Sequence, residues 1–412
     1  MKILIIVHSF PPKINSAARL YSELSKFLRE RGHDVTVLTS RPTEEDVVDR
    51  LDEYYKTRRG RLFWNGIRVI RVPPHFNFFS RIIGGKVVRF ALSCLNFIIW
   101  GIFTKRHDVV LVYSPPLFLG VAGYFISKVK KSYYVLNLQD IHPKVLIDAG
   151  IIQSPLLKRI LLSMETFNYS NASSIIVYSE GNKKYLVDKH INKDKIAVIP
   201  NWIDTNLVQP AEKMNALRRE LDLENKFVVT YAGSLTPAQQ PEIIVKAAIL
   251  LKDYNEIRFC IVGDGPSKPE LHKLIADYKL INVCLLPVQA GKKYLDVLNA
   301  SDVCLLPLSK DIPPQTVPGK LADIMACGKP VISSVDLTGD AAKIIEEAAC
   351  GYNVSAGDAL GLSNTILEMY NNRDGLKVMG DNARQFAIRV FSQDVCLKNF
   401  ERLLVSVSGH LG

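Results

Sequence analysis

The most informative stretch of the chain is residues 315–331, Gln-Thr-Val-Pro-Gly-Lys-Leu-Ala-Asp-Ile-Met-Ala-Cys-Gly-Lys-Pro-Val. A loop ends at Pro318, and the spacing that follows predicts a helix that begins at Gly319–Lys320 and stops at Gly328. An apolar strand begins at Pro330. A loop, a short helix and a buried strand in succession are typical of an α/β protein.

The start of this helix also carries chemistry. A helix N-terminus presents unpaired backbone N–H groups and the positive end of the helix dipole, which together suit a phosphate. Lys320 can add a positive charge there, and the Asp323 carboxylate can accept hydrogen bonds from two ribose hydroxyls. The stretch therefore predicts a seat for a nucleoside diphosphate, as a nucleotide-sugar enzyme requires. The alternative is a solvated helix start with an ordinary capping acid.

Outward from this stretch, β-branched runs alternate with helical patterns, and Asn65-Gly66 predicts a hairpin turn. The first series of predicted strands comprises 3–7, 34–39, 108–112, 133–138, 174–178 and 195–199. The second comprises 227–232, 257–262, 282–286, 302–306, 330–334 and 351–354. Strands that alternate with helices indicate parallel sheets, so we predict two Rossmann-like domains that face a central cleft. The boundaries we predict are 1–200, 201–390 and a helical segment, 391–412, that crosses back to the first domain.

Composition narrows the class of protein. A chain of 412 residues is long enough for two domains, and 48% hydrophobic residues indicate a globular protein. The formal net charge of +11 favours anionic partners. Aromatic residues are not interleaved with a basic stripe, so we expect no nucleic acid. No signal peptide or membrane span is evident, and the scattered cysteines, among them Cys260, Cys284 and Cys304, are expected to be buried thiols in a reducing cytoplasm.

Several nucleotide chemistries are excluded by missing motifs. The chain has neither the glycine pattern of a dinucleotide fold nor a P-loop, and it contains no Asp-x-Asp pair or zinc spacing. Among the nucleotide sites considered, the one that remains is a diphosphate site without a metal ion or cofactor. Such a site is built from helix N-termini, hydroxyl groups and cationic side chains. Gly233-Ser234 follows a predicted strand and is a second phosphate-loop candidate, and Gly265 lies in a tight turn after the next strand.

Longer matches resemble glycosyltransferase family 4. In the second half they are Phe227 to Ser234, Ile261 to Pro266, Ala300 to Pro307 and Lys320 to Val331; in the first half they are Lys2 to Pro12, Arg31 to Thr39, Leu138 to Pro143 and Ile199 to Asp204. The resemblance covers essentially the whole chain and implies the GT-B fold and transfer with retention of anomeric configuration. The chain is most similar to the branch that builds bacterial O-antigens and capsules, which includes N-acetylfucosamine transferases.

The chain departs from the family pattern at the donor site. Gln315 and Asp323 stand where the family has two glutamates, and the second of these grips the ribose. Ser234 and either Gln239 or Gln240 replace the usual arginine and lysine of the phosphate site, which leaves Lys320 as the cation. In the first loop, Asn15-Ser16-Ala17-Ala18 replaces a Gly-Gly pair and keeps small side chains near the substrate.

The resemblance implies roles for the remaining candidates. Lys320, the amides near Gly319 and Gly233, and the Ser234 hydroxyl would stabilise the departing diphosphate. Asp140 and His142 would line the cleft in the first domain, and either could orient or deprotonate the acceptor hydroxyl. The donor would be a UDP-sugar, and the acceptor a saccharide on a polyprenyl diphosphate. The alternatives are a non-catalytic partner with a degenerate donor site and, further behind, a nucleotide-sugar epimerase.

Residues 78–106 combine apolar and basic side chains in a helical pattern. We expect an anionic membrane surface as a partner, at the inner face of the cell membrane, with Phe76, Phe78, Phe79, Ile82 and Ile83 as the inserting edge. The part from residue 90 to 103 is instead expected to pack against the sheet of the first domain.

Overall fold

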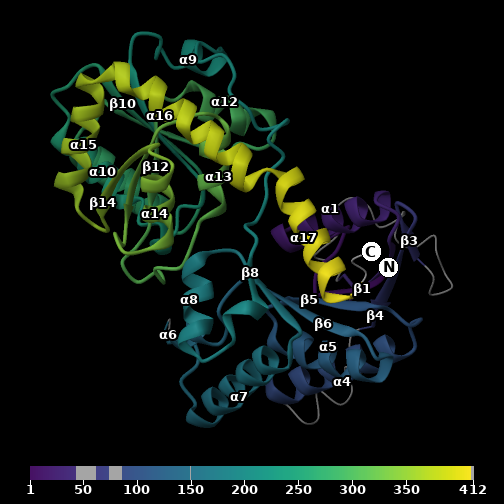
Figure 1. Ribbon diagram of the computed structural model, residues 1–412. Helices are drawn as coiled ribbons and strands as arrows, with labels where there is room; N and C mark the ends of the chain where they lie inside the picture. Colours follow the sequence, from purple (N-terminus) through teal and green to yellow (C-terminus); the bar gives the residue numbers. More distant parts are fainter. Residues whose placement is uncertain (43–61, 74–85, 149, 410–412) are drawn as a thin grey trace. The chain divides into compact units, whose positions relative to one another are not determined.

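The computed structural model describes residues 1–42, 62–73, 86–148 and 150–409 and divides the chain into two units. The first unit comprises Met1–Pro200 together with the segment from Leu397 onward, and the second comprises Asn201–Cys396. Figure 1 shows a sheet flanked by helices in each. No helix within the described ranges is long and apolar enough to cross a membrane.

The first unit is built on an eight-stranded sheet in the order β3-β4-β2-β1-β5-β6-β7-β8. Its strands are β1 (Lys2–Val7), β2 (Asp34–Ser40), β3 (Leu62–Trp64), β4 (Ile67–Val72), β5 (Val109–Ser114), β6 (Tyr133–Leu138), β7 (Ser174–Val177) and β8 (Ile196–Val198). All neighbours are parallel except β3 and β4. The predicted turn joins these two, with Asn65 and Gly66 both at positive φ (46° and 73°), as a type I′ hairpin requires.

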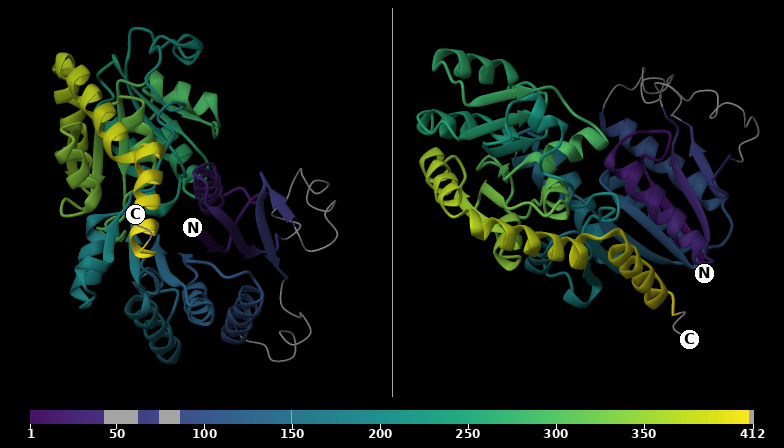
Figure 2. Two further views of the ribbon diagram at one scale, coloured as in Figure 1. Left: turned by 45° about the vertical axis from the view of Figure 1, so that its right-hand side comes forward. Right: turned by 90° about the horizontal axis from the view of Figure 1, so that it is seen from above.

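The helices of the first unit cover both faces of its sheet (Figure 1). They are α1 (Ser16–Glu30), α4 (Lys86–Ile102), α5 (Leu117–Lys130), α6 (Lys144–Asp148), α7 (Pro155–Asn171), α8 (Glu180–Asp188), the 3₁₀ turn η2 (Lys193–Lys195) and most of α17 (Gln393–Val407). Glu401 of α17 pairs with His33 and Arg31 at 3.0 and 3.2 Å, and the Ser408 hydroxyl lies 3.8 Å from Met1 Sδ. The last helix is therefore packed near the start of the first strand, and the end of α17 lies close to the marked N-terminus in both views of Figure 2.

The second unit is built on a six-stranded parallel sheet in the order β11-β10-β9-β12-β13-β14. Its strands are β9 (Phe227–Ala232), β10 (Ile257–Val262), β11 (Val283–Leu286), β12 (Val303–Pro307), β13 (Val331–Val335) and β14 (Gly351–Ser355). Its helices are α9 (Ala216–Glu220), η3 (Pro237–Gln239), α10 (Glu242–Leu250), α11 (Lys268–Asp277), α12 (Lys292–Ala300), α13 (Gly319–Ala326), α14 (Asp340–Glu347), α15 (Ala359–Asn371), α16 (Arg373–Phe386) and the π-helical turn η4 (Ala387–Phe391).

Alternation along the strands builds two cores in this unit. Cys304 and Leu306 of β12 pack with α13 and α16 on one face, whereas Val303 and Leu305 pack with α10 and α15 on the other. Because successive side chains of a strand point to opposite faces, a sheet covered on both sides reads as a nearly continuous apolar run. The predicted parallel α/β architecture is confirmed. The carboxyl ends of its strands consequently meet at one edge, where ligands bind in such sheets.

One finer expectation was wrong. Cys284 is only half-buried, because it lies on the edge strand β11, while Cys260 and Cys304 are buried. Helix α4 packs against the sheet through Phe97, as expected, and its other side exposes Leu95, Ile99 and Trp100, since one face of a helix is enough to cover the core. The expected inserting edge, 76–83, lies outside the described residues.

Candidate active site

The candidate donor site is centred on Lys320, the second residue of α13 at the carboxyl edge of the second sheet. Its ammonium nitrogen donates to Gln239 Oε1 at 2.7 Å and to the Tyr231 hydroxyl at 3.0 Å, and it lies 4.3 Å from the centre of the Tyr231 ring. The three residues come from α13, η3 and the end of β9. Lys320 forms no ion pair within the described ranges, so its charge is held by neutral groups.

Burial changes the acidity of this lysine. Removal of the amine from water lowers the pKa of Lys320 to about 8, because the charged form loses solvation without gaining a carboxylate partner. A cation that is desolvated and held only by a hydroxyl, an amide and an aromatic face is poised to gain an anion. The arrangement therefore favours a phosphate at this point.

Gly233 lies directly beneath the lysine. A Cβ atom at this position would lie 2.5 Å from Lys320 Nζ, so any larger residue would move the end of the lysine side chain. The Gly233 N–H itself donates to the Val262 carbonyl at 2.9 Å, so it is not available to a phosphate. A role for the other amides near Gly233 stays a prediction, and Gly233 leaves space for the lysine.

Ser234, Gly265 and the two candidate glutamines lie at the same carboxyl edge of the second sheet as Lys320. Ser234 is exposed, and its carbonyl accepts the Tyr231 hydroxyl at 2.7 Å, which fixes the ring under Lys320. Gly265 supports the loop from below, since a Cβ atom there would lie 2.3 Å from the Leu235 carbonyl oxygen. Of the two glutamines considered, Gln239 accepts from Lys320, whereas the buried side-chain oxygen of Gln240 has no hydrogen-bond partner among the described residues.

Asp323 lies one turn after Lys320 and is half-buried. One of its carboxylate oxygens accepts the hydroxyl of Tyr294, from α12, at 3.0 Å. Burial, followed by the nearby Asp323 charge, raises the pKa of Tyr294, so the tyrosine remains protonated and donates. Tyr294 holds the carboxylate in place at the carboxyl edge of the sheet.

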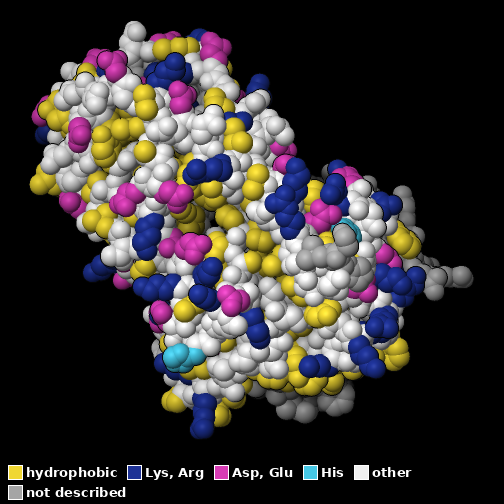
Figure 3. Space-filling view, viewed as in Figure 1, with side chains coloured by type: hydrophobic (Ala, Val, Ile, Leu, Met, Phe, Trp, Pro, Cys, Tyr) yellow, Lys and Arg dark blue, Asp and Glu magenta, His cyan; other side chains and the backbone are white. Residues whose placement is uncertain are grey.

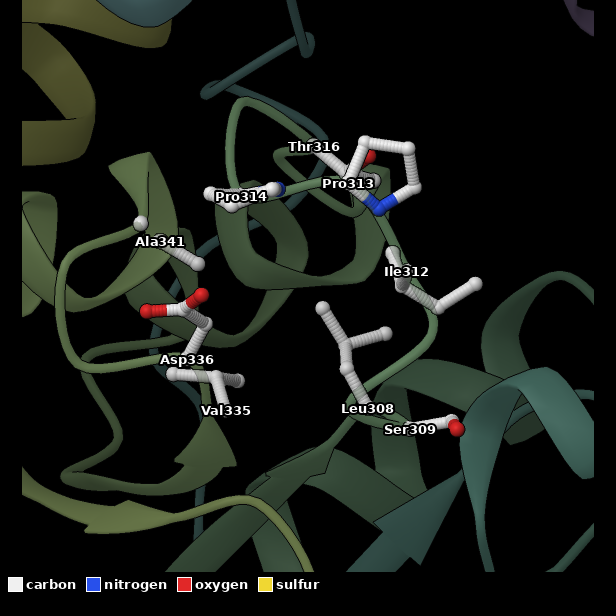
Figure 4. Close-up of a pocket in the computed structure, with 10 residues that line it drawn as sticks. Leu308, Ser309, Ile312, Pro313, Pro314, Thr316, Val335, Asp336 and Ala341 are labelled. Carbon is white, nitrogen blue, oxygen red and sulfur yellow. The ribbon is translucent and has the colours of Figure 1, made fainter. Parts of the chain in front are cut away.

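Gln315 and Gly319 lie on the segment between β12 and α13. The segment is fixed from α14, because the Asp340 N–H donates to the Pro314 carbonyl at 2.8 Å. Gln315 is half-buried, and Gly319 is exposed as the first residue of the helix. A shallow pocket adjoins the segment at the ends of β12 and β13, lined by Leu308, Ser309, Ile312, Pro313, Pro314, Thr316, Val335, Asp336, Gly339 and Ala341 (Figure 4).

The first unit carries the other candidates. Asp140 and His142 follow β6, and the His142 N–H donates to the Asp140 carbonyl at 2.9 Å. Burial raises the pKa of Asp140 and lowers that of His142, while each side chain partly offsets the shift of the other. The loop is held by buried Gln139, whose amide donates to Asn137 at 3.2 Å. An acid and a histidine with such opposed shifts suit proton transfer.

Asn15 and Ser16 begin α1 and are both exposed. Asn15 is the N-cap, and its side-chain oxygen accepts the Ala18 N–H at 2.9 Å. Its described role is therefore helix capping, which explains the residue type without a ligand.

The structure thus gathers Gly233, Gln239 and Lys320, with Asp323 one turn away. Sequence reasoning missed Tyr231 and Tyr294. Tyr231 stands at the carboxyl end of a buried strand, where a hydroxyl needs a partner, and that position is the signal that could have identified it. Tyr294 gave no such signal, because it lies in an ordinary amphipathic helix.

Two parallel-sheet units, with a cationic site at the carboxyl edge of one of them, are features of the GT-B glycosyltransferases. The comparison with known families agrees. Residues 16–202 match the family described as glycosyl transferase 4-like domain, and residues 213–386 match glycosyl transferases group 1. The chain belongs to the GT-B glycosyltransferases and is a glycosyltransferase.

Similar proteins span most of the chain. Escherichia coli K12 WcaI, whose name provisionally assigns it as a glycosyl transferase of colanic acid biosynthesis, is 24% identical over 80% of this chain and 82% of its own. An Escherichia coli protein named UDP-Gal:alpha-D-GlcNAc-diphosphoundecaprenol alpha-1,3-galactosyltransferase is 25% identical over 53% of this chain and 56% of its own. The crystal structure of Anabaena Alr3699/HepE has a TM-score of 0.73 at 20% identity and covers 98% of this chain and 100% of that one.

Proposed function

We propose that this glycosyltransferase moves a sugar from a UDP-sugar to a saccharide carried on a polyprenyl diphosphate, with retention of anomeric configuration. The sugar we propose is an N-acetylamino sugar such as N-acetylfucosamine, and the product serves O-antigen or capsular polysaccharide synthesis. The reaction needs no metal ion or cofactor in this proposal, because a lysine supplies the positive charge.

The observation that carries the proposal is the isolated cation at Lys320. As the bond to the sugar breaks, negative charge grows on the leaving diphosphate. A preorganised cation in a poorly solvated site stabilises this charge more than water does, and such stabilisation is usually the largest catalytic contribution. Lys320 meets these conditions, since it is desolvated and oriented by Tyr231 and Gln239.

The neighbouring residues support a nucleotide as the donor. With the diphosphate at Lys320, the adjoining ribose would lie toward Asp323, one helical turn away, where Tyr294 orients the carboxylate. A carboxylate that accepts two hydroxyl groups recognises a ribose diol. The Anabaena structure, which has this fold, was solved in complex with UDP. This supports a uridine nucleotide as the donor.

The acceptor side of the proposal rests on the first unit. Asp140, with its raised pKa, or His142, with its lowered pKa, would orient the acceptor hydroxyl or take its proton. One relative is named for a lipid-linked acceptor, GlcNAc-diphosphoundecaprenol. That name supports an acceptor of the same chemical class here.

A lipid-linked acceptor requires the enzyme to reach a membrane surface. Helices α4, α5 and α7 pack side by side and expose Leu95, Ile99, Trp100, Phe125, Val129, Leu156 and Ile160, with Phe103 just beyond α4; we name these residues the apolar helical face. Exposed Lys105, Arg106, Lys128, Lys131 and Arg159 lie on or next to the same helices. Along the lower edge of this unit, Figure 3 shows yellow apolar side chains among dark blue cationic ones. We propose that this face rests on an anionic membrane, peripheral to the cytoplasmic leaflet.

A reconstituted transfer assay tests the function. The purified chain is incubated with a short-chain polyprenyl-diphosphate-linked N-acetylglucosamine acceptor and one of several UDP-, GDP- or ADP-sugars, and products are separated and weighed by mass spectrometry. We expect transfer from a UDP-N-acetylamino sugar. Addition of a metal chelator should leave the transfer rate unchanged. If the sugar is α-linked in the donor, NMR should show that it is also α-linked in the product.

Lys320→Gln is the matched variant, because it keeps a hydrogen-bonding group of similar length without the charge. We expect kcat to fall at least tenfold, since the lost interaction strengthens in the transition state. Transfer at the wild-type rate by this variant, or transfer only from GDP- or ADP-sugars, would contradict the proposal.

A further inference from the structure

Two cysteines stand side by side on neighbouring strands of the second unit. Cys260 of β10 and Cys284 of β11 are register partners in a parallel ladder. Residues in register on adjacent strands point to the same face, and their strands lie about 4.8 Å apart. Both thiols border the same small apolar cluster, with Leu223 and Val228.

The spacing is compatible with a covalent bond between the two sulfurs. Disulfides join residues whose Cα atoms are about 4.4–6.8 Å apart, and Cβ atoms must approach to about 3.5–4.5 Å. Strand β11 is at the edge of the described sheet, with β10 as its neighbour. An edge strand is held on one side only, so it can move the short distance that the bond requires.

The two thiols are unequal, which gives each a distinct role. Cys284 is half-buried and can be reached from solvent, whereas Cys260 is buried at 1% exposure. The interaction between the two thiols lowers the pKa of Cys284 to about 7, and the same interaction, with burial, raises the pKa of Cys260. A thiol with a pKa near the ambient pH and access to solvent is the better attacking group. Burial raises the pKa values of the other cysteines, which are Cys94, Cys304, Cys327, Cys350 and Cys396.

We propose that Cys260 and Cys284 are a reversible oxidation site that closes to an intramolecular disulfide, with a low-molecular-weight disulfide such as oxidised glutathione as the oxidant. The Cys284 thiolate attacks one sulfur of oxidised glutathione, forms a mixed disulfide and releases one glutathione thiolate. Cys260 then loses its proton to solvent and attacks the Cys284 sulfur, which releases the second glutathione. Two protein thiols are oxidised and one glutathione disulfide is reduced to two thiols.

The bond reaches the donor site through the backbone, and this part of the inference rests on the proposed function. Strand β10 leads directly to Gly263, where a Cβ atom would lie 1.9 Å from the Gly233 carbonyl oxygen. Val262, two residues after Cys260, accepts the Gly233 N–H at 2.9 Å. The Gly263 N–H in turn donates to the carbonyl of Leu286, at the end of β11, at 3.1 Å. A shift of β11 toward β10 therefore acts on the backbone beside Gly233, and we expect weaker UDP binding in the oxidised protein.

The test begins with the wild-type chain. Purified protein is exposed to oxidised or reduced glutathione at pH 8, quenched with acid, denatured and alkylated with iodoacetamide. We expect five alkylated cysteines after oxidation, instead of the seven present in the sequence. A peptide pair linked through Cys260 and Cys284 should appear by mass spectrometry and disappear with dithiothreitol. Seven alkylated cysteines in the oxidised sample would overturn the proposal.

Variants separate the two roles. In Cys260→Ala the resolving thiol is missing, so the glutathione adduct should accumulate on Cys284. In Cys284→Ser neither adduct nor linkage should form. Cys94→Ser, the matched control at another half-buried cysteine, should link as the wild type does. If Cys94 forms a disulfide or a glutathione adduct to the same extent as Cys284, reactivity follows exposure alone, and the roles assigned to Cys284 and Cys260 are overturned.

Calorimetric titration with UDP tests the coupling to the donor site. Reduced protein should bind UDP, oxidised protein at least threefold more weakly, and dithiothreitol should restore the affinity. If the protein with the Cys260–Cys284 disulfide binds UDP as tightly as the reduced protein, the proposed effect on the donor site is wrong, whereas the oxidation site itself stands. Absence of UDP binding in the reduced protein contradicts the proposed donor site, while the linked peptide is judged independently.

Discussion

Lys320 shows how a single residue acquires a function from its surroundings. A surface lysine has a pKa near 10.4 and carries its charge throughout the physiological range. Here burial lowers the pKa of Lys320 to about 8, so the free protein holds a cation that is close to losing its proton. In the proposed function a bound diphosphate stabilises the charged form, so we expect binding to be linked to a proton.

The first prediction is that UDP affinity decreases with rising pH. Below pH 8 Lys320 is charged before binding, and above it the amine must take up a proton. The association constant should fall by up to about tenfold per pH unit between pH 8.5 and 9.5. Titration calorimetry in buffers of different ionisation enthalpy should detect the proton uptake. The variant Lys320→Gln should bind weakly with no such dependence, and an equal slope in that variant would assign the effect to another group.

The second prediction concerns Asp323. Its replacement by alanine should weaken UDP binding about ten- to a hundredfold, because a hydrogen bond to a charged group contributes about 1.5–3 kcal/mol. Wild-type protein should also bind 2′-deoxyuridine diphosphate more weakly than UDP, and Asp323→Ala should lose that preference. These affinities are measured by titration calorimetry.

Tyr294→Phe is the matched control for Asp323. It removes the hydroxyl that orients the carboxylate but leaves the carboxylate itself, so the loss of affinity should be smaller than in Asp323→Ala. If Asp323→Ala still distinguishes the two nucleotides, the carboxylate does not bind the ribose.

At the scale of elements, a buried arginine joins α9 to the second sheet. Arg218 is 1% exposed and donates to the carbonyls of Ala300 and Leu223 at 2.7 and 2.9 Å. It also pairs with Asp302 at 2.5 Å. Asp302 in turn accepts the Val228 N–H at 2.8 Å, so one pair connects a helix with the beginnings of β9 and β12.

The third prediction follows from this pair. Removal of one partner of a buried ion pair costs up to about 3–5 kcal/mol, but Asp302 also pairs with Lys213 and keeps that partner. The carbonyls of Ala300 and Leu223 lose their donor, and a buried acceptor without a donor costs about 1–3 kcal/mol. Arg218→Ala should therefore lower the free energy of unfolding of the second unit by about 2–3 kcal/mol in urea titrations. Arg219→Ala is the control, because the Arg219 side chain, next to Arg218 in the sequence, is exposed. Its removal should change the free energy of unfolding by at most about 0.5 kcal/mol. Equal losses in both variants would contradict the role of burial.

At the scale of the whole molecule, the apolar helical face gathers exposed apolar side chains from three helices that pack against one another. Phe103 is 82% exposed, and Val129 and Phe125 are 57% and 45% exposed. Such patches on a protein surface mark interaction sites. Lysine and arginine side chains beside the patch each add about 1 kcal/mol of attraction to an anionic membrane.

The fourth prediction is that the protein binds vesicles containing phosphatidylglycerol at low salt and is released at high salt. Ile99→Asp together with Phe103→Asp should reduce co-sedimentation at least tenfold while activity on a soluble acceptor persists. Leu207→Asp with Ile281→Asp places the same charges at exposed positions of the second unit and should not change binding. Equal losses of vesicle binding in both double variants, or no vesicle binding by the wild type, would contradict the proposal that the apolar helical face contacts the membrane.

The sequence by itself determined the secondary structure and the class of fold. Apolar β-branched runs, the Asn65-Gly66 turn and the Pro318–Gly328 helix signals act over a few residues, and the structure confirms the strands to within one or two positions. The chain also indicated Lys320 and Asp323, because a helix start is visible in local spacing. Gln239 was only one of two candidates.

Only the tertiary structure decided how these residues work together. Tyr231 and Gln239 lie 89 and 81 residues before Lys320, and no local pattern connects them. They meet because parallel strands bring their carboxyl ends, and the loops that follow, to one edge of a sheet. The same packing removes Lys320 from water and lowers its pKa, and strand register pairs Cys260 with Cys284. Burial and register depend on the assembled sheet, so short-range sequence patterns could not reveal them.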